Sequence, residues 1–176
     1  MSRALRVLGI DPGSLKTGFG VIDVHGSRNA YVSSGVIRLP ADRPLPERLK
    51  IIFDSMLEVI DEYRPAEIAV EQVFMSKSAG SALKLGQARG AAIVAGTFRD
   101  IPIAEYEAKK VKQSVVGSGA ADKQQMQHMT KTLLKLSDVP QEDAADALAV
   151  ALCHINSRRH FSQLGDARQY RRGRVV

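Results

Sequence analysis

The stretch Leu5-Arg6-Val7-Leu8-Gly9-Ile10-Asp11, residues 5–11, is an almost continuous apolar run that stops at an acid. A second short run, Ile68-Ala69-Val70, stops at Glu71 in the same way. Short apolar runs rich in β-branched residues and bounded by polar ones are typical of buried strands. The sequence therefore predicts two buried strands that each end in a carboxylate.

Two more carboxylates lie in the run Asp143-Ala144-Ala145-Asp146-Ala147-Leu148-Ala149. Alanine is the strongest helix former, and residues three apart leave the same face of a helical turn. If this helix faces the two strand ends, Asp11, Glu71, Asp143 and Asp146 form an oxygen-rich pocket. Such a pocket repels itself unless a hard divalent cation occupies it, so the pattern predicts a metal site.

The remaining pattern predicts an α/β fold. Three strands with short links, near 5–10, 19–24 and 31–39, are typical of an antiparallel meander, and two further strands are expected near 67–72 and 102–106. Apolar residues at helical spacing predict helices near 45–64, 81–98, 107–116 and 122–136, followed by the one that carries Asp143. This order predicts a mixed five-stranded sheet covered by helices on both faces.

The positive charge is concentrated at one end of the chain. The 176 residues carry a net charge of +6, of which residues 157–176 contribute six arginines against Asp166 alone. We expect residues 1–156 to form one domain and residues 157–176 to be a flexible, arginine-rich tail that contacts polyanions through charge. The chain has no apolar run of 18 residues and no signal-peptide pattern, so a cytoplasmic location without membrane association is expected.

Each acid taken alone has an ordinary explanation. Asp11 precedes Pro12-Gly13 and could only shape a turn. Asp143 could complement a helix dipole, and Glu71 could be a solvated strand end. Asp146 is harder to explain in this way, because it lies between alanines that should pack inward. Four such coincidences together are improbable, which favours the metal site.

Several motifs then carry a resemblance to a known family. They are, in chain order, Gly9-Ile10-Asp11-Pro12-Gly13-Ser14, Thr17-Gly18, Glu71-Gln72-Val73-Phe74, Ser81-Ala82-Leu83-Lys84-Leu85-Gly86-Gln87-Ala88-Arg89-Gly90, Val111-Lys112-Gln113 and Asp143-Ala144-Ala145-Asp146-Ala147-Leu148. Over residues 5–156 this series resembles the RuvC-type Holliday junction resolvases. The resemblance implies a ribonuclease-H-like fold, a homodimer, and paired Mg²⁺-dependent cuts in four-way DNA junctions during recombination and repair.

The resemblance also assigns roles to individual residues. It makes the four acids metal ligands, Lys112 and Lys123 basic residues of the site, and Phe74 a wedge that stacks on a base. It further implies cooperation with a branch-migration motor of the RuvA/RuvB type. Lys77, Lys84 and Arg89 follow Glu71 closely and are expected to contact DNA together with Phe74 and the two site lysines.

The chemistry of such a site follows from its ligands. Four carboxylates without histidine or cysteine suit Mg²⁺ or Mn²⁺ better than Zn²⁺. Two Mg²⁺ ions roughly 3.5–4 Å apart can activate a water and stabilise the leaving oxygen. By analogy with this type of site, hydrolysis leaves a 5′-phosphate and a 3′-hydroxyl, and the lysines position phosphates.

Two other functions compete with this interpretation. Asp11-Pro12-Gly13 and Thr17-Gly18 also suit an actin-like phosphotransferase, but such proteins have two related lobes and 176 residues provide one. A non-catalytic junction-binding protein is the second alternative. It would be expected to have lost at least one of the four acids.

Overall fold

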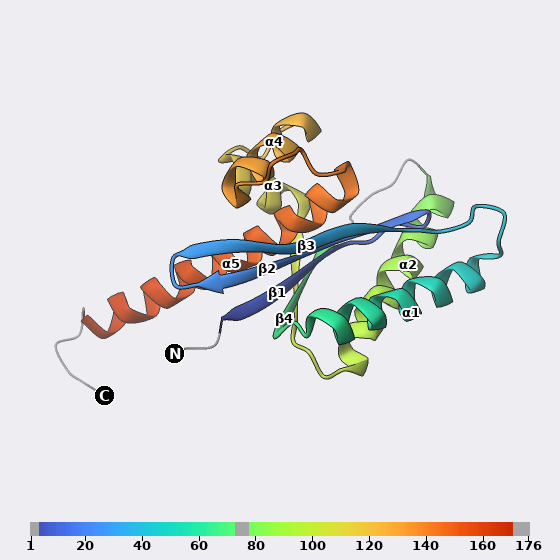
Figure 1. Ribbon diagram of the computed structural model, residues 1–176, viewed down its shortest axis with the longest axis horizontal. Coiled ribbons are helices and arrows are strands. Elements are labelled where there is room, and N and C mark those ends of the chain that lie inside the picture. Colours follow the sequence, from blue (N-terminus) through green and yellow to red (C-terminus); the bar gives the residue numbers. More distant parts are fainter. Residues whose placement is uncertain (1–3, 73–77, 171–176) are drawn as a thin grey trace.

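A computed structural model describes the chain over residues 4–72 and 78–170, with side chains described as far as Ser162. Five strands form one sheet of order β3-β2-β1-β4-β5 (Figure 1). β1 pairs antiparallel with β2 and β2 with β3, whereas β4 is parallel to β1 and to β5. The expected meander and mixed sheet are therefore confirmed. The strands are β1 (Leu5–Asp11), β2 (Lys16–His25), β3 (Arg28–Arg38), β4 (Glu67–Gln72) and β5 (Ile103–Glu107).

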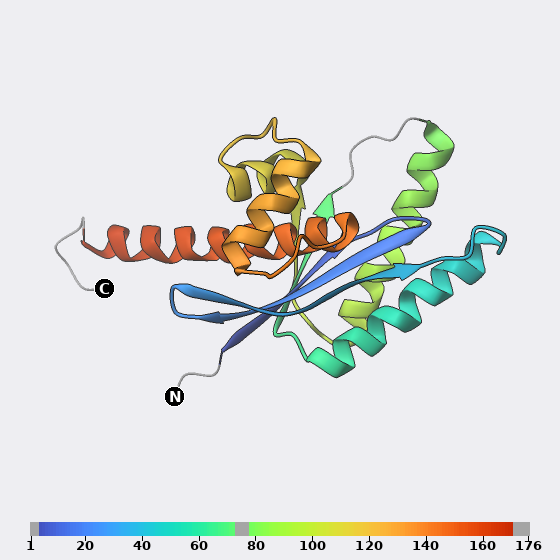
Figure 2. The ribbon, with the colours of Figure 1, turned by 45° about the horizontal axis from the view of Figure 1, so that its top comes forward.

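Helices cover both faces of this sheet, as the sequence predicts. α1 (Leu45–Tyr63) and α2 (Ala79–Phe98) cover one face, while α3 (Ala108–Val116), α4 (Lys123–Leu134) and α5 (Glu142–Tyr170) lie on the other (Figure 2). Successive residues of β1 point to opposite faces, so Val7 joins the core under α5 and Leu8 joins the core under α1 and α2. Both cores bury apolar side chains, which stabilises the three-layer arrangement.

Helix α5 lies unusually close to the sheet. A Cβ atom added to Gly9 would come within 2.0 Å of the Ala147 carbonyl oxygen, and one added to Gly18 within 2.0 Å of the Asp143 carbonyl oxygen. Only glycine permits backbone approach at this distance. These two residues of β1 and β2 therefore set how near the beginning of α5 lies to the end of β1.

The bounds of the helices and strands differ from expectation mainly at the C-terminal end of the chain. α5 continues as one helix as far as Tyr170, so the expected domain boundary between residues 156 and 157 falls inside it. β2 and β3 also begin three residues earlier than the apolar pattern indicates, because β2 starts with Lys16-Thr17-Gly18 and β3 with Arg28-Asn29-Ala30, which contain no large apolar side chain. Within the described part of the chain, no helix combines the length and the apolar character needed to cross a membrane.

A buried polar cluster ties α5 to the far end of β4. The Tyr106 hydroxyl lies 2.9 Å from His154 Nδ1, and His154 Nε2 lies 2.6 Å from Glu67 Oε2. Arg158 pairs with the other oxygen of Glu67. Because Glu67 and Glu71 belong to the same strand, this cluster fixes the position of α5 along the strand that carries a candidate metal ligand.

We expect His154→Leu to destabilise the protein by about 1–3 kcal/mol, because Tyr106 and Glu67 each lose a buried partner. Thermal unfolding of the metal-free protein measures the effect, with His128→Leu on the exposed side of α4 as the matched control. Equal melting temperatures for the two variants would show that the cluster does not hold α5 in place.

Candidate active site

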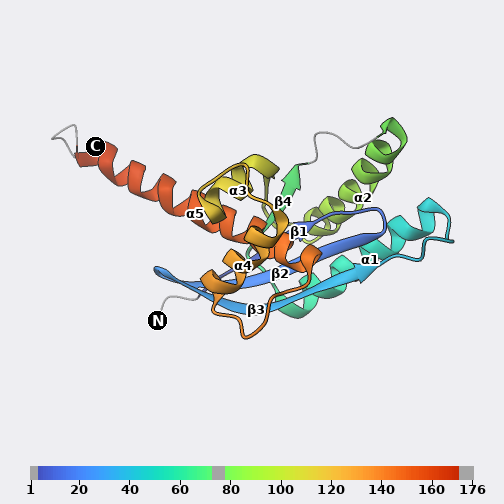
Figure 3. The same ribbon diagram turned by 90° about the horizontal axis from the view of Figure 1, so that it is seen from above.

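The ends of the two central parallel strands bring Asp11 and Glu71 together. Ile10 pairs with Val70 in the β1–β4 register, so Asp11, the last residue of β1, lies beside Glu71, the last residue but one of β4. The two carboxyl groups are close enough for each to affect the pKa of the other. β1 and β4 lie beside each other (Figure 3), so Asp11 and Glu71 lie close together at the same end of the sheet, as the sequence predicts.

The first turns of α5 bring in the other two acids. α5 begins at Glu142 and packs across β1 and β2, which places Asp143 and Asp146 over the end of β1. The Asp143 carbonyl rests against Gly18, which pairs with Asp11 in the β1–β2 register. The close approach of α5 to the sheet therefore brings acids from opposite ends of the chain into one region.

Two further residues orient Asp143. Gln141 Nε2 donates a hydrogen bond to Asp143 Oδ2 at 2.9 Å, and Lys16 Nζ lies 4.0 Å from the same oxygen. Neither residue was expected from the sequence. The only available signals are weak: Gln141 lies just before the first turn of a helix, and Lys16 begins a strand.

Burial and neighbouring charges raise the pKa values of Asp11, Glu71 and Asp146. Burial, followed by the charges of Glu71, Asp146 and Asp143, raises the pKa of Asp11 to about 8. Burial also raises the pKa of Asp146 to about 6, against the opposing charge of Lys123. The pKa of Glu71 is raised by burial and by Asp146, while the hydrogen bond from Asp11 opposes the rise. Negative charge in this region is thus poorly compensated by the protein alone.

This donor set fits a hard divalent cation. All four ligand candidates offer carboxylate oxygens, which Mg²⁺, Mn²⁺ and Ca²⁺ prefer. Within the described residues, no three acid, histidine or cysteine side chains are grouped tightly enough to hold one ion as they stand. Charged groups affect one another's pKa values over longer distances than those between a metal ion and its ligands. The acids can therefore surround the site without all converging on one point. A cation would favour their inward rotation by compensating the repulsion.

The raised pKa of Asp11 predicts how stability depends on pH in the metal-free protein. Between about pH 4 and pH 8 the folded protein retains a proton that the unfolded chain has released, so stability falls as pH rises. Asp11→Asn removes this effect. We expect the variant to melt several degrees above wild type at pH 8 in EDTA and at the same temperature at pH 4. A temperature difference that does not change with pH would contradict the assignment.

Lys112 and Lys123, the two expected basic residues of the site, lie beside two of the acids. Together with Glu71 and Asp146 they line a cavity of about 210 Å³ between α3, α4, β4 and α5. Lys123 is the first residue of α4, which a capping box at Asp122 begins, and it pairs with Glu142. The charges of both lysines lower the pKa of Asp146. Both lysines thus stabilise negative charge in the acidic site.

Arg89 has structural partners beside Glu71. Its Nε donates to the Glu71 carbonyl oxygen at 3.1 Å, and its guanidinium pairs with Glu105 on β5. It therefore braces the end of β4, in addition to any contact with DNA. Lys84 is exposed on α2. Phe74 and Lys77 lie outside the described residues.

Comparison with known proteins agrees with this arrangement. A family model described as crossover junction endodeoxyribonuclease RuvC matches residues 7–154. A protein of that name from Saccharophagus degradans is 64% identical over 170 residues, which cover 97% of this chain and 98% of the relative. One from Teredinibacter turnerae is 63% identical over 175 residues, with the same coverage.

Solved structures show the same similarity. Thermus thermophilus RuvC is 34% identical with a TM-score of 0.81, over 89% of this chain and 96% of that one. The structure of T. thermophilus RuvC in complex with a Holliday junction substrate gives a TM-score of 0.84 with the same identity and coverage. The yeast mitochondrial Holliday junction resolvase Ydc2 shares the fold at 13% identity, with a TM-score of 0.68 over 93% of this chain and 85% of its own. The chain described here belongs to the RuvC family of crossover junction endodeoxyribonucleases.

Proposed function

We propose that this protein is a structure-selective endonuclease that resolves four-way DNA junctions by metal-dependent hydrolysis of two strands. The observation that carries the proposal is the set of four acids that β1, β4 and α5 bring to one end of the sheet, where burial and neighbouring charges raise the pKa values of Asp11, Glu71 and Asp146. Relatives at 63–64% identity are named as crossover junction endodeoxyribonucleases. The junction-bound structure of a relative supports the same substrate.

The direct test compares a synthetic four-way junction with linear duplexes of the same sequence. In Mg²⁺ we expect paired cuts in two opposed junction strands, with 5′-phosphate and 3′-hydroxyl ends, and little cutting of the duplexes. EDTA should abolish the cuts. Equal rates on junction and duplex would contradict structure selectivity, and retained cutting in EDTA would contradict metal dependence.

Asp11, Glu71, Asp143 and Asp146 would hold two Mg²⁺ ions, with Mn²⁺ as a substitute. Bound metal would supply an activated water and stabilise the leaving oxygen. The chain's own groups orient the acids: Gln141 and Lys16 hold Asp143, while Arg89 holds the backbone of Glu71. Lys112 and Lys123 would contact the phosphate to be cut, since they line the same cavity as Glu71 and Asp146.

Lys112→Ala and Lys123→Ala are expected to slow cleavage about 10- to 100-fold. A cation beside the reacting phosphate stabilises charge that develops in the transition state, so cutting should suffer more than binding. Single-turnover cleavage and junction binding in Ca²⁺ measure the two effects separately, with Lys50→Ala on α1 as the control. Equal losses in binding and cutting would place the lysines on remote backbone contacts instead.

The proposed homodimer would use α2. Leu83, Val94 and Phe98 are exposed large apolar residues of this helix, at 70%, 52% and 61%. A Cβ atom at Gly86 or Gly90 would meet no atom within 4 Å, so a second helix can approach closely there. Two symmetric active sites would explain paired cuts. Sedimentation should give a dimer for wild type and a monomer for Val94→Glu. A monomeric wild type would contradict the proposed homodimer.

The remaining contacts rest on the family resemblance. Phe74 would stack on a base at the crossover, where an aromatic contact is worth roughly 1–3 kcal/mol. Lys77, Lys84 and Arg89 would contact the DNA nearby. Residues 1–156 would form the nuclease unit, and the arginine-rich residues 157–176 would extend it. A branch-migration motor of the RuvA/RuvB type would be the protein partner.

A further inference from the structure

A groove of about 910 Å³ opens beside the acidic site, between the edge strand β3 and the segment that joins α4 to α5. We name it the β3 groove. Its lining includes Arg28, Tyr31 and Arg38 on the strand and Lys135 and Val139 on the opposite wall. Arg28 and Arg38 are the first and last residues of β3, so the groove follows the strand for about 33 Å at 3.3–3.4 Å per residue.

One end of the β3 groove meets the active site. Gln141 lines the groove and also donates the hydrogen bond to Asp143. Arg38 pairs in register with Lys16, whose Nζ lies 4.0 Å from Asp143. A polymer lying across the acids could therefore continue directly into the groove. Its connection to the active site distinguishes the β3 groove from the other surface pockets.

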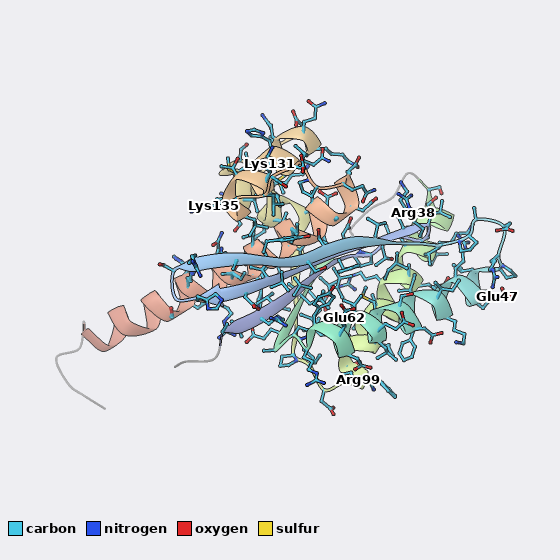
Figure 4. All side chains as sticks on the ribbon, in the orientation of Figure 1. Arg38, Glu47, Glu62, Arg99, Lys131 and Lys135 are labelled. Atoms are coloured by element: carbon cyan, nitrogen blue, oxygen red, sulfur yellow. The ribbon has the colours of Figure 1, made fainter. Side chains whose placement is uncertain are left out.

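The charges of the groove are uneven. Arg28, Arg38 and Lys135 line it against a single acid, Asp138. Within the described part of the chain, none of these three cations forms an ion pair. On the opposite side of the sheet, by contrast, Lys50 and Arg43 are paired with acids of α1. Figure 4 labels Arg38 at the end of β3 and Lys135 at the end of α4, with Glu47, Glu62 and Arg99 on the side of α1 and α2.

The groove also offers apolar contact. Tyr31 is 40% exposed and Val139 is 52% exposed, and both belong to its walls. Unpaired cations beside exposed aromatic surface are typical of sites that follow a nucleic-acid backbone, because phosphates meet the cations while sugars and bases meet the rings. The strand length of about 33 Å, at 3.3–3.4 Å per residue, is close to one turn of duplex DNA, which is about 34 Å.

We propose that the β3 groove binds the sugar–phosphate backbone of the junction arm that leaves the cleavage site, with Arg28, Arg38 and Lys135 on phosphates and Tyr31 against a sugar or base. The proposal rests on the proposed junction-cleaving function and extends its contacts away from the crossover. It assigns Arg28, Arg38, Lys135 and Tyr31 to substrate binding, and it gives none of them a part in the chemistry.

The first test measures how junction binding depends on salt. The combined variant Arg28→Ala, Arg38→Ala, Lys135→Ala is compared with Arg43→Ala, Lys50→Ala, Arg64→Ala, which removes the same charge from the α1 side. Anisotropy in Ca²⁺ gives the binding constant over a range of salt concentrations. Each lost phosphate contact should reduce the slope of log K against log salt by about 0.9, so we expect a fall of about 2–3 for the groove variant alone.

Cleavage at saturating junction distinguishes this proposal from the proposed function. The groove variant should bind about 10- to 100-fold more weakly at moderate salt yet turn over within about twofold of wild type, since it leaves the acids intact. Equal slopes for the two combined variants would overturn the groove proposal. Loss of cutting by wild type itself would instead overturn the proposed function.

The second test locates the DNA on the groove. Cys153 is the chain's single cysteine and is buried, so Tyr31→Cys introduces one accessible thiol. A photoactivatable aryl azide attached there should crosslink to the junction arm within roughly one helical turn of the cut. Crosslinks confined to the crossover, or no crosslink to bound junction, would contradict the assignment. The same label attached to Ser55→Cys on α1 provides the control.

Discussion

Asp11→Asn, Glu71→Gln, Asp143→Asn and Asp146→Asn are each expected to cut a four-way junction at least about 1,000-fold more slowly than wild type. Each change keeps the size of the side chain but removes the charge that holds a cation. A loss of this size corresponds to about 4 kcal/mol of transition-state stabilisation, which is reasonable for a metal-assisted hydrolysis. Single-turnover cleavage of a labelled junction in Mg²⁺ measures it.

Junction binding should behave in the opposite way. Removing a carboxylate from a site where burial and like charges already raise the pKa of Asp11 and Asp146 lowers the repulsion of phosphates, so affinity should stay the same or rise. Asp54→Asn on α1 is the control, because it removes one charge from the opposite side of the sheet. Near wild-type cutting by any of the four variants would remove that residue from the set of metal ligands.

Gly18→Ala is expected to reduce cleavage about 100-fold or more without touching a charged group. Its Cβ would lie within 2.0 Å of the Asp143 carbonyl oxygen, so the first turn of α5 must move away from the sheet. Asp143 would then shift relative to Asp11, and a misplacement of about 1 Å can cost about 100-fold in rate. Cleavage rates over a range of Mg²⁺ concentrations test this, and we expect half-saturation at higher Mg²⁺.

The matched control for this variant is Gly80→Ala. A Cβ at Gly80 meets no atom within 4 Å, and alanine favours the helix in which it lies. The variant should therefore cut like wild type. If Gly18→Ala also cuts normally at low Mg²⁺, then the close approach of α5 to β2 does not control the site, and our explanation of its geometry is wrong.

Local pattern and chemistry predict much of this fold. β4 begins and ends where its apolar run and flanking acids indicate, and α1 follows the three- and four-residue spacing of its apolar side chains. The candidate acids are recognisable because charged side chains rarely end buried runs without a reason. What the sequence predicts is thus which residues share a strand end or a helical face.

Contacts between distant elements were harder to predict. Nothing in the sequence around Gly18 indicates that it faces the backbone of Asp143, since the contact depends on how α5 crosses the sheet. The same reason applies to Gln141 and Lys16 beside Asp143. Arg89 was expected on DNA from its charge, its place soon after Glu71 and the family resemblance, whereas the structure also gives it Glu105 on β5 as a partner.

The most direct test of the central claim, that the four acids hold the catalytic ions, is anomalous diffraction from crystals of the junction complex grown with Mn²⁺. We expect anomalous peaks bounded by the carboxylates of Asp11, Glu71, Asp143 and Asp146, at metal–oxygen distances of about 2.0–2.3 Å, and no such peaks with Asp11→Asn. Mn²⁺ peaks away from these four carboxylates, in crystals in which the junction is cut, would contradict the account.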